Sequence, residues 1–412
     1  MTEIRYRLKK PFKFGTNPAT LSTSENERLR VLLTANTMTH GGGAESLVFN
    51  IFNELKRRPD IHVKLVTFQK AFDRTINDST HLEEILLKDP DFCNCDSYVN
   101  LSVTKPNNVD LGHFTQIVNE FKPHIVHSNL FIAELITHEV IFPGIKYFTH
   151  CHDNMPQLRN FSLQTLLHKN LLTDFYEKQH LVKRYLQCDN RFISISADTT
   201  QYFETVLPHK LAEDIYPLDN AIVTKNFHGA GKERDLSKIR IVNVGTFLSK
   251  KNQQFLVDVA LALQKRNLPF EIIMLGESYD FDKVKAKVKA NNLENVVLMP
   301  GNKVNVADYY ADANVYVHVA TYEPFGLVLL EAMASGLPVV TLDGKGNRDL
   351  IKAGKNGYMI YQQNPEEFVD AIEKVVGDKN TYAAMSTNAV AFAKKYDIES
   401  YADKLISLYR TG

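Results

Sequence analysis

The sequence predicts an α/β protein with two doubly wound domains, each built on its own parallel sheet. Short runs rich in Val, Ile and Leu alternate with helical patterns along the chain, which is typical of repeated strand–helix–strand units. A length of 412 residues exceeds the usual size of one domain, and a hydrophobic content of 44% is enough for two separate cores. We therefore expect two domains of ordinary size.

The first domain is assigned to residues 1–222, of which 1–27 form an N-terminal arm. A buried strand, a glycine turn, a helix at 45–56 and a second strand follow one another directly, which makes a βαβ unit. Further apolar runs, separated by helical stretches, extend the same alternation. The strands of this domain are expected at residues 30–35, 63–68, 124–127, 146–150 and 191–196.

The second domain is assigned to residues 237–394, after a linker at 223–236. The linker is polar and contains two glycines and five charged residues. A last helical pattern covers 396–409, within a terminal segment at 395–412. The strands of this domain are expected at residues 239–245, 271–276, 296–299, 315–319 and 339–341.

Composition and charge exclude several classes of protein. Lys and Arg total 48, as do Asp and Glu, so the net charge of zero gives no global attraction to nucleic acid or to an anionic bilayer. No run of about 18 apolar residues is present, and no apolar core follows the basic N-terminus, so neither a spanning helix nor a signal peptide is predicted. We expect a cytoplasmic protein. The four cysteines form no paired Cys-x-x-Cys motifs, and no zinc site is predicted.

The most informative segment of the chain spans residues 321–340. Gly326 lets the backbone leave a loop tightly, and the run at 327–335 contains helix formers and no breaker. Gly336 and Pro338 then end the helix. Unpaired amides at the helix start, together with the positive end of the helix dipole, favour a phosphate group. The segment therefore predicts a loop, a helix with an anion-binding end, and a buried strand.

Two carboxylates bracket this helix start. Glu323 lies just before it, and Glu331 lies about one and a half turns inside, at a rise of about 1.5 Å per residue. Carboxylates accept hydrogen bonds from hydroxyl groups, so one is suited to a ribose and the other to a sugar beyond the phosphates. The pattern predicts a nucleotide-sugar site.

This segment resembles the retaining glycosyltransferases of family 4, whose signature Glu-x-Phe-Gly-x-x-x-x-Glu-Ala-x-Ala-x-Gly-x-Pro-Val it matches at every position. The resemblance implies the GT-B architecture, in which two Rossmann-like domains face each other across a cleft and the last helix crosses back onto the first domain. It also implies that Glu323 contacts the transferred sugar and Glu331 the ribose. The donor-binding residues that it implies around the helix start are Pro324, Phe325, Gly326 and Leu327.

The start of the second domain extends the resemblance. The family has Gly-Arg-Leu there, followed after three residues by Lys-Gly or Lys-Asn, and by position its lysine is Lys251. The resemblance implies that Lys251 neutralises the donor diphosphate and stabilises the charge left when the sugar departs. Thr246 occupies the arginine position among the donor-binding residues and carries no charge. Lys250, also assigned to donor binding, or Arg348 is the candidate for the missing cation.

Two features of the first domain also match the family. Gly42 and Gly43 resemble the family's Gly-Gly-x-Glu turn, which borders the cleft near the donor diphosphate. A glycine run alone is weak evidence, but here it follows the first predicted strand. Asn220 matches the asparagine at the family's domain hinge, and Ala221 stands where the family usually has glycine.

The third predicted feature of the first domain is a histidine at the end of a strand, where ligands bind in open α/β sheets. His152 and Asp153 resemble the family's His-Asp pair, in which the histidine lies under the transferred sugar. We therefore assign His152 a catalytic role beside the motif glutamate and lysine. His150, two residues earlier on the same face of the strand, is the competing candidate, and His127 is a third.

The resemblance implies transfer of a hexose or N-acetylhexosamine from a nucleoside-diphosphate sugar to a hydroxyl group, with retention of anomeric configuration. We expect a UDP-sugar; the sugar epimer and a GDP donor stay open. No metal or other cofactor is expected, because cationic side chains and helix amides neutralise the diphosphate and no Asp-x-Asp motif stands in the expected place. The expected acceptor is a cell-surface glycan, lipid-linked or polymeric. The alternating apolar and basic residues of Ile4–Phe14 are suited to peripheral contact with an anionic membrane, or to an edge strand.

Two rival functions stay open at this point. A nucleotide-sugar 2-epimerase shares the two-domain architecture but releases an isomerised sugar without an acceptor. A non-catalytic GT-B partner subunit keeps the fold without turnover, and Thr246 in place of arginine is the feature that favours it. An NAD enzyme is disfavoured, because no Gly-x-Gly-x-x-Gly follows a strand with the acidic residue that NAD binding requires.

Overall fold

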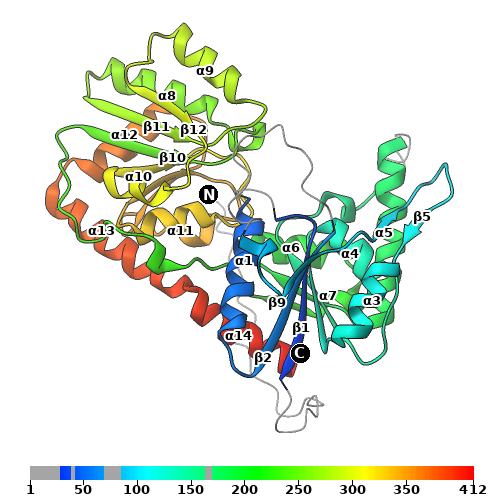
Figure 1. The fold of residues 1–412 in the computed structure, drawn as a ribbon. Helices are drawn as coiled ribbons and strands as arrows, with labels where there is room; N and C mark the ends of the chain where they lie inside the picture. Colours follow the sequence, from blue (N-terminus) through cyan, green and yellow to red (C-terminus); the bar gives the residue numbers. More distant parts are fainter. Residues whose placement is uncertain (1–27, 39–41, 69–84, 163–168) are drawn as a thin grey trace.

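The computed structural model describes residues 28–38, 42–68, 85–162 and 169–412, which form two α/β domains, each with a central parallel sheet (Figure 1). This confirms the predicted fold class. The N-terminal arm at 1–27 and the membrane contact predicted for it lie outside the described residues, as does the first glycine of the turn at 41–43.

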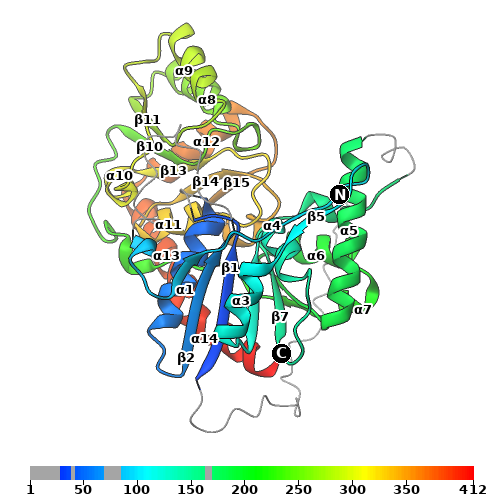
Figure 2. The same cartoon turned by 45° about the vertical axis from the view of Figure 1, so that its right-hand side comes forward.

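The first domain contains a sheet of seven parallel strands in the order β3-β2-β1-β6-β7-β8-β9. Its helices pack on both faces, and a small antiparallel hairpin lies beside α5 (Figures 1 and 2). The sheet strands are β1 (Leu29–Ala35), β2 (Ile61–Thr67), β3 (Phe92–Asn94), β6 (Ile125–Asn129), β7 (Lys146–Cys151), β8 (Arg191–Ser194) and β9 (Ile215–Pro217). The hairpin strands are β4 (Tyr98–Asn100) and β5 (Asn108–Asp110), and the α-helices are α1 (Gly43–Lys56), α3 (Gly112–Phe121), α4 (Phe131–Thr137), α5 (Lys169–Cys188), α6 (Ala197–Val206) and α7 (His209–Ala212).

The second domain contains a sheet of six parallel strands in the order β12-β11-β10-β13-β14-β15. Its strands are β10 (Ile239–Val244), β11 (Phe270–Leu275), β12 (Val297–Gly301), β13 (Val315–His318), β14 (Val339–Leu342) and β15 (Gly357–Ile360). Its helices are α8 (Gln254–Lys265), α9 (Phe281–Ala290), α10 (Val306–Asp312), α11 (Leu327–Ala334), α12 (Pro365–Val376) and α13 (Lys379–Ala393). In both sheets the order reverses next to the first strand of the domain, and the carboxyl ends of strands at such a switch point are where open α/β sheets bind ligands.

Both faces of each sheet are buried, which explains the nearly continuous apolar runs of the strands. Along β1, Val31 and Leu33 face the side covered by α1, and Leu32 faces the opposite side with α3 and α5. Along β10, Ile241 packs with α8 and α12, whereas Val242 packs with α11. Alternate residues of one strand therefore serve two separate cores.

The chain passes between the domains twice, at two neighbouring points. Ile222 and Asp397 form a parallel bridge, with Ile222 N donating to Tyr396 O at 2.9 Å and Ile398 N to Ile222 O at 2.9 Å. Asp397 also accepts hydrogen bonds from the backbone N–H and hydroxyl of Thr224 and caps α14 through the N–H of Glu399 at 3.0 Å. The two crossing segments are thus tied together at the predicted hinge.

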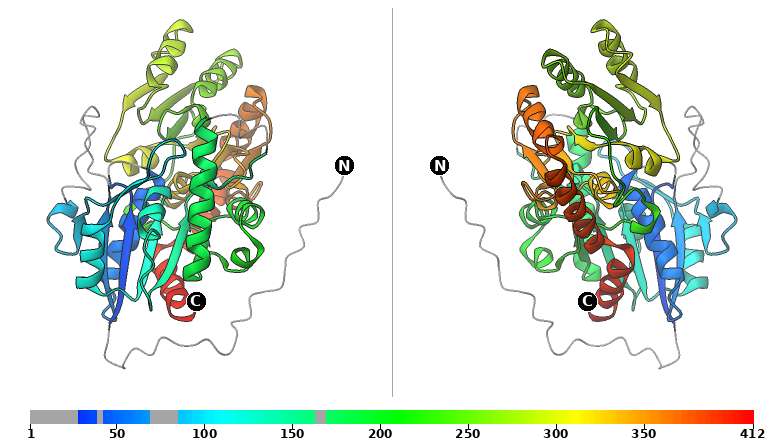
Figure 3. Two further views of the ribbon diagram at one scale, coloured as in Figure 1. Left: turned by 90° about the vertical axis from the view of Figure 1, so that its right-hand side faces the viewer. Right: turned by 90° about the vertical axis from the view of Figure 1, so that its left-hand side faces the viewer.

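The last helix, α14 (Ile398–Thr411), lies against the first domain rather than the second (Figures 1 and 3). Tyr401, Leu405 and Tyr409 belong to the core cluster that α1 and the first sheet form. The helix begins and ends two residues later than the predicted 396–409. One turn of 3-10 helix at Lys394–Tyr396 precedes it and changes the direction of the chain.

The segment predicted as a polar linker is partly anchored to the second domain. Arg234 is 8% exposed, and its guanidinium donates to the carbonyl oxygens of Tyr310, Ala311, Ala313 and Ser335. Arg234 is buried because carbonyl groups at the ends of α10 and α11 accept hydrogen bonds from Nη1 and Nη2 of its guanidinium.

Candidate active site

The predicted site residues lie at the carboxyl ends of central strands of the two sheets. Lys251 follows β10, and Glu323 follows β13 and precedes α11, while His152 follows β7 in the first domain. The two domains contact each other near the start of α11, where Leu327 packs against the core cluster of the first domain.

The start of α11 is a tight glycine turn, as the sequence predicted. Gly326 has φ 107°, where a side chain would be strained, and the helix begins at Leu327. Phe325 is 3% exposed and contributes to the core under the helix, while Pro324 is half-buried. Four adjacent residues thus hold the helix start at a fixed place in the site.

A second glycine segment packs against the backbone of Glu323. The Glu323 N–H donates to Gly344 O at 2.9 Å, and residues Glu323 and Lys345 form a parallel bridge. A Cβ atom added at Gly346 would overlap the carbonyl oxygen of Pro324. Only glycine allows the two loops to lie this close, so the loop after β14 positions the motif carboxylate.

Glu323 is 7% exposed and has two donors on one oxygen. Its Oε2 lies 2.6 Å from Lys251 Nζ and 3.0 Å from His318 Nε2. Burial acts to raise the pKa of Glu323, but Lys251 and His318 together hold that pKa well below its usual range. Glu323 is therefore an ionised carboxylate at neutral pH.

Glu331 differs in its charge environment. It lies on α11 and is half-buried, and its Oε2 accepts a hydrogen bond from the hydroxyl of Tyr310 at 3.2 Å. Burial raises the pKa of Glu331 to about 7, and the Tyr310 hydroxyl only partly offsets this effect. The two motif carboxylates are therefore held in different protonation regimes.

The residue at the family's arginine position and the two candidate cations are more exposed than the motif glutamates. Thr246 and Lys250 have exposed side chains, and Lys250 O accepts hydrogen bonds from Thr321, which ties the lysine turn to the loop before Glu323. Arg348 forms a bidentate ion pair with Asp343 at 2.8 and 2.7 Å. Because Asp343 engages its guanidinium, Arg348 is less suited than Lys250 to supply the positive charge of the family arginine, whose position Thr246 occupies.

Three histidines form a buried column in the first sheet. His150 stacks on His152 with ring centroids 4.0 Å apart, and its Nδ1 lies 3.3 Å from His127 Nε2. His127 Nδ1 in turn pairs with the hydroxyl of Tyr409 on α14. His152 is 7% exposed, whereas His127 and His150 are 0% exposed, so His152 is the member of the column that reaches the surface.

The tautomer of His152 follows from its neighbour. Asn129 Nδ2 donates to Thr34 O at 2.9 Å, so its Oδ1 is the atom that lies 2.7 Å from His152 Nε2. Because an amide oxygen only accepts, Nε2 of His152 carries the proton. Burial lowers the pKa of His152 to about 3, which keeps the ring neutral and leaves Nδ1 as an acceptor. Nδ1 has no hydrogen-bond partner within the part of the chain that the structure describes.

The glycine turn of the first domain lies against the start of α11. A Cβ atom added at Gly43 would lie 3.4 Å from Leu327 Cδ1, and one added at Gly42 would lie 3.0 Å from a carboxylate oxygen of Glu45. Glu45 itself accepts a hydrogen bond from Thr37 at 2.7 Å. The turn therefore faces the phosphate-binding end predicted for the second domain.

Sequence reasoning missed four polar side chains of the site. Tyr316 and His318 lie on one face of β13, Tyr310 supports Glu331 from α10, and Asn129 supports His152 from β6. Residues 316 and 318 are two positions apart on a strand, so the sequence indicated that their side chains share one face. An apolar run that includes a tyrosine and a histidine nevertheless predicts a buried core strand and not a site.

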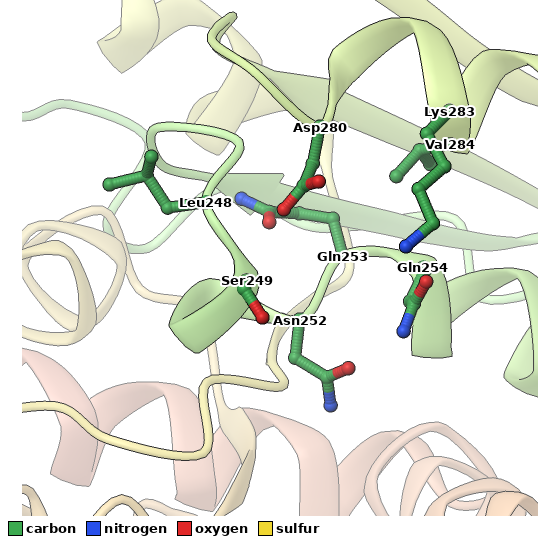
Figure 4. A pocket seen from close by; sticks show the side chains of 8 residues that line it. All are labelled: Leu248, Ser249, Asn252, Gln253, Gln254, Asp280, Lys283 and Val284. Carbon is green, nitrogen blue, oxygen red and sulfur yellow. The ribbon is translucent and has the colours of Figure 1, made fainter.

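Among residues 28–38, 42–68, 85–162 and 169–412, no group of three or more His, Cys, Asp and Glu side chains is arranged to hold a metal ion. No helix in these ranges has both the length and the apolar character needed to cross a membrane. A pocket lies beside the lysine turn, at the starts of α8 and α9 (Figure 4), with Asn252, Gln253, Asp280 and Lys283 among its lining residues.

Parts of the chain are similar to known proteins. Residues 225–392 match the family described as glycosyl transferases group 1. The poly(glycerol-phosphate) alpha-glucosyltransferase of Bacillus subtilis is 30% identical over 214 residues, which are 52% of this chain and 30% of that protein. The poly(ribitol-phosphate) alpha-N-acetylglucosaminyltransferase of Staphylococcus aureus is 28% identical over 201 residues, which are 48% of this chain and 41% of that protein. The chain thus matches less than half of either relative.

The fold has a wider match than the sequence. The crystal structure of HepE from Anabaena in complex with UDP and glucose superimposes with a TM-score of 0.70 at 18% identity, covering 92% of this chain and 99% of that one. Residues 225–392 therefore match the glycosyl transferases group 1 family, and the chain as a whole has the GT-B fold.

Proposed function

We propose that this protein is a retaining glycosyltransferase that moves a hexose or N-acetylhexosamine from a UDP-sugar to a hydroxyl group of a cell-surface glycan. One observation carries the proposal. Glu323 and Glu331 stand on either side of a helix start, in different protonation regimes, with Lys251 beside the first of them. The helix start is suited to bind a diphosphate, and the carboxylates on its two sides are suited to the sugar and the ribose that the diphosphate joins.

Each side chain has a distinct task in this proposal. Lys251 and the first amides of α11 neutralise the diphosphate, without a metal ion. Glu331 accepts hydrogen bonds from the ribose, and Glu323 accepts them from the sugar. His152 lies under the transferred sugar, as the resemblance implies, and Lys250 supplies the second positive charge.

The proposed reaction balances without an additional group. The bond between the anomeric carbon and the leaving phosphate oxygen breaks, and a bond from the acceptor oxygen forms on the same face of the sugar. The acceptor's proton passes to the leaving phosphate, which departs as UDP. Fixed charges and dipoles around the phosphate lower the barrier, because they need no reorganisation as negative charge develops.

The relatives support the choice of substrates. Both curated relatives carry names of transferases that act on polyol-phosphate polymers, one with a glucosyl and one with an N-acetylglucosaminyl group. HepE was crystallised with UDP and glucose. We therefore propose UDP-glucose and UDP-N-acetylglucosamine as the first donors to test, with polymeric polyol phosphates and lipid-linked glycans as acceptors.

The test is release of UDP or GDP from a panel of nucleotide sugars, with and without each acceptor. Wild-type protein is expected to release one nucleotide from one donor, and Glu323→Gln and Lys251→Ala to abolish that release. Lys289→Ala, an exposed lysine on α9, is the matched control and keeps the wild-type rate. NMR of the product gives the anomeric configuration.

Other results would reject the proposal. Release that survives Glu323→Gln would remove the assigned site. An isomerised free sugar formed without acceptor would identify an epimerase. Binding of the donor without release, across the whole acceptor panel, would identify a non-catalytic subunit.

A further inference from the structure

We propose that His318, oriented by Tyr316, is a positioning residue that holds Glu323 in place when Lys251 turns to the donor diphosphate. This inference rests on the proposed function. It concerns β13, which passes under the site and contributes no residue to the family signature.

The hydrogen bonds to the Glu323 carboxylate involve one of its two oxygens. Lys251 and His318 both donate to Oε2, at 2.6 and 3.0 Å. Among the described residues no hydrogen bond to Oε1 is found, so Oε1 is the oxygen left to accept one from a sugar hydroxyl. The carboxylate is therefore oriented through Oε2 and available through Oε1.

Lys251 has two roles that compete. Its ammonium group pairs with Glu323, and the proposed reaction needs the same group at the diphosphate. An ammonium is a compact charge on a flexible stem and moves between anionic partners at small cost. Once Lys251 contacts the diphosphate, His318 is the remaining side-chain donor seen on Oε2 in the described part of the chain.

His318 is suited to this task because it is rigid and has a defined tautomer. It is 2% exposed, and its ring lies nearly parallel to that of Tyr316, with an interplanar angle of 21°. Ionised Glu323 only accepts, so Nε2 of His318 carries the proton. Burial lowers the pKa of His318, which keeps the ring neutral and makes Nδ1 an acceptor.

Tyr316 holds the other ring nitrogen. Its hydroxyl lies 3.3 Å from His318 Nδ1 and 3.2 Å from Val244 O, at the end of β10. Val244 O accepts the phenolic proton or shares it with Nδ1, so Tyr316 holds the orientation of the His318 ring, while ionised Glu323 fixes the Nε2–H form. Val244 precedes the turn that carries Lys251, so the Tyr316 hydroxyl also connects β13 to the lysine turn.

The same row of aromatic rings extends to the second carboxylate. The Tyr316 ring centroid is 5.9 Å from that of Tyr310, whose hydroxyl donates to Glu331. Tyr310 therefore contacts Glu331 and His318 contacts Glu323, and the Tyr316 ring lies between these two side chains.

The test separates the donor of the hydrogen bond from the volume of the ring. His318→Gln keeps an N–H donor at the position of Nε2, whereas His318→Met fills similar space without a donor. Tyr316→Phe removes the phenolic proton. The matched control for it is Tyr382→Phe, which removes a buried hydroxyl that donates to Asn314 O at 2.8 Å in the same domain.

The readouts are steady-state turnover with UDP-glucose or UDP-N-acetylglucosamine and binding of UDP alone. His318→Met is expected to lower kcat by about 100-fold, the usual effect of a misplaced catalytic group, and to leave the Kd for UDP within about twofold. His318→Gln recovers most of the rate, and Tyr382→Phe keeps it. Wild-type turnover by His318→Met would overturn the proposal, as would equal losses in His318→Met and His318→Gln.

A second measurement does not depend on activity. In protein with ¹⁵N-labelled histidine, the His318 ring is expected to show the Nε2–H tautomer, and Glu323→Gln, whose amide can donate as well as accept, to convert it to a mixture; His318→Gln identifies the signal. A mixture in the wild type would overturn the proposal. An inactive wild type with the expected tautomer would count against the proposed function alone.

Discussion

Lys251 Nζ lies 2.6 Å from Oε2 of Glu323, so the cation implied for the donor diphosphate is paired with the carboxylate implied for the donor sugar. Both side chains are mostly buried, at 21% and 9% exposure. Removing one partner of a buried pair leaves an uncompensated charge, whereas removing both does not.

This relationship predicts a separation of stability from activity. Lys251→Met should lower the free energy of unfolding by up to about 3–5 kcal/mol, because Glu323 is left as a buried carboxylate with only His318 beside it. The double variant Lys251→Met/Glu323→Gln should recover most of the stability and remain inactive. Urea denaturation followed by circular dichroism measures the first quantity, and UDP release measures the second. A double variant as unstable as Lys251→Met would show that the pair does not account for the loss.

The raised pKa of Glu331 predicts a pH dependence of donor binding. The carboxylate form accepts hydrogen bonds from a ribose, and with a pKa of about 7 this form is lost as the pH falls below neutrality. The KM for the donor should therefore rise by up to about tenfold per pH unit on the acid side. Glu331→Gln should have a higher KM that does not change with pH over this range. An unchanged pH profile in Glu331→Gln would assign the titration to another group.

Ionisation of Glu331 favours donor binding but lowers the stability of the folded protein. Its pKa is higher in the folded protein than the ordinary 4.5, so the stability linked to its protonation is present below about pH 4.5 and is lost as the pH rises through about 7. Glu331→Gln, which stays neutral, should therefore gain stability relative to the wild type between pH 6 and pH 8. Thermal unfolding at a series of pH values measures this difference, and a constant difference would contradict it.

Two tyrosines of α14 provide a matched pair of variants. The Tyr409 hydroxyl pairs with His127, whereas the Tyr401 hydroxyl is buried and has no partner among the described residues. Tyr409→Phe should destabilise the protein by about 1–3 kcal/mol, because Nδ1 of His127 loses its partner, and Tyr401→Phe should be neutral or stabilising. Differential scanning calorimetry measures both. Equal effects would mean that the hydrogen bond to His127 contributes nothing.

Arg234 predicts that the segment between the domains is part of the second domain's structure. Arg234→Met should expose the linker and leave carbonyl groups at the end of α10 unpaired, at a cost of roughly 3 kcal/mol or more. Arg234→Lys should recover only part of this, because an ammonium cannot match the fork of guanidinium donors.

Hydrogen exchange measures the effect of Arg234 locally. Amides of residues 229–236 and 310–313 should exchange faster in Arg234→Met. Lys225→Met, at an exposed lysine of the same linker, is the control and should leave exchange unchanged. A linker that exchanges as fast in the wild type as in Arg234→Met would contradict the anchoring role.

The sequence was informative where local rules suffice. The turn at Gly326, the helix that follows it and the strand after Pro338 depend on backbone preferences of single residues, and all three are present in the structure. The short edge strands β3, β9 and β15 were not predicted, because three or four residues are too few to show a period. Their pairing is decided by the neighbouring strand rather than by their own residues.

By itself, the sequence determined the α/β class, the two alternating halves, and the pairing of Glu323 with Glu331 around one helix start. Tertiary structure decided which of three histidines reaches the surface, that Arg234 is buried, and that His318 contacts Glu323. The physical reason is the range of the interactions. Turn and helix preferences act over a few residues, whereas burial, hydrogen-bond partners and pKa shifts depend on residues brought together from distant parts of the chain.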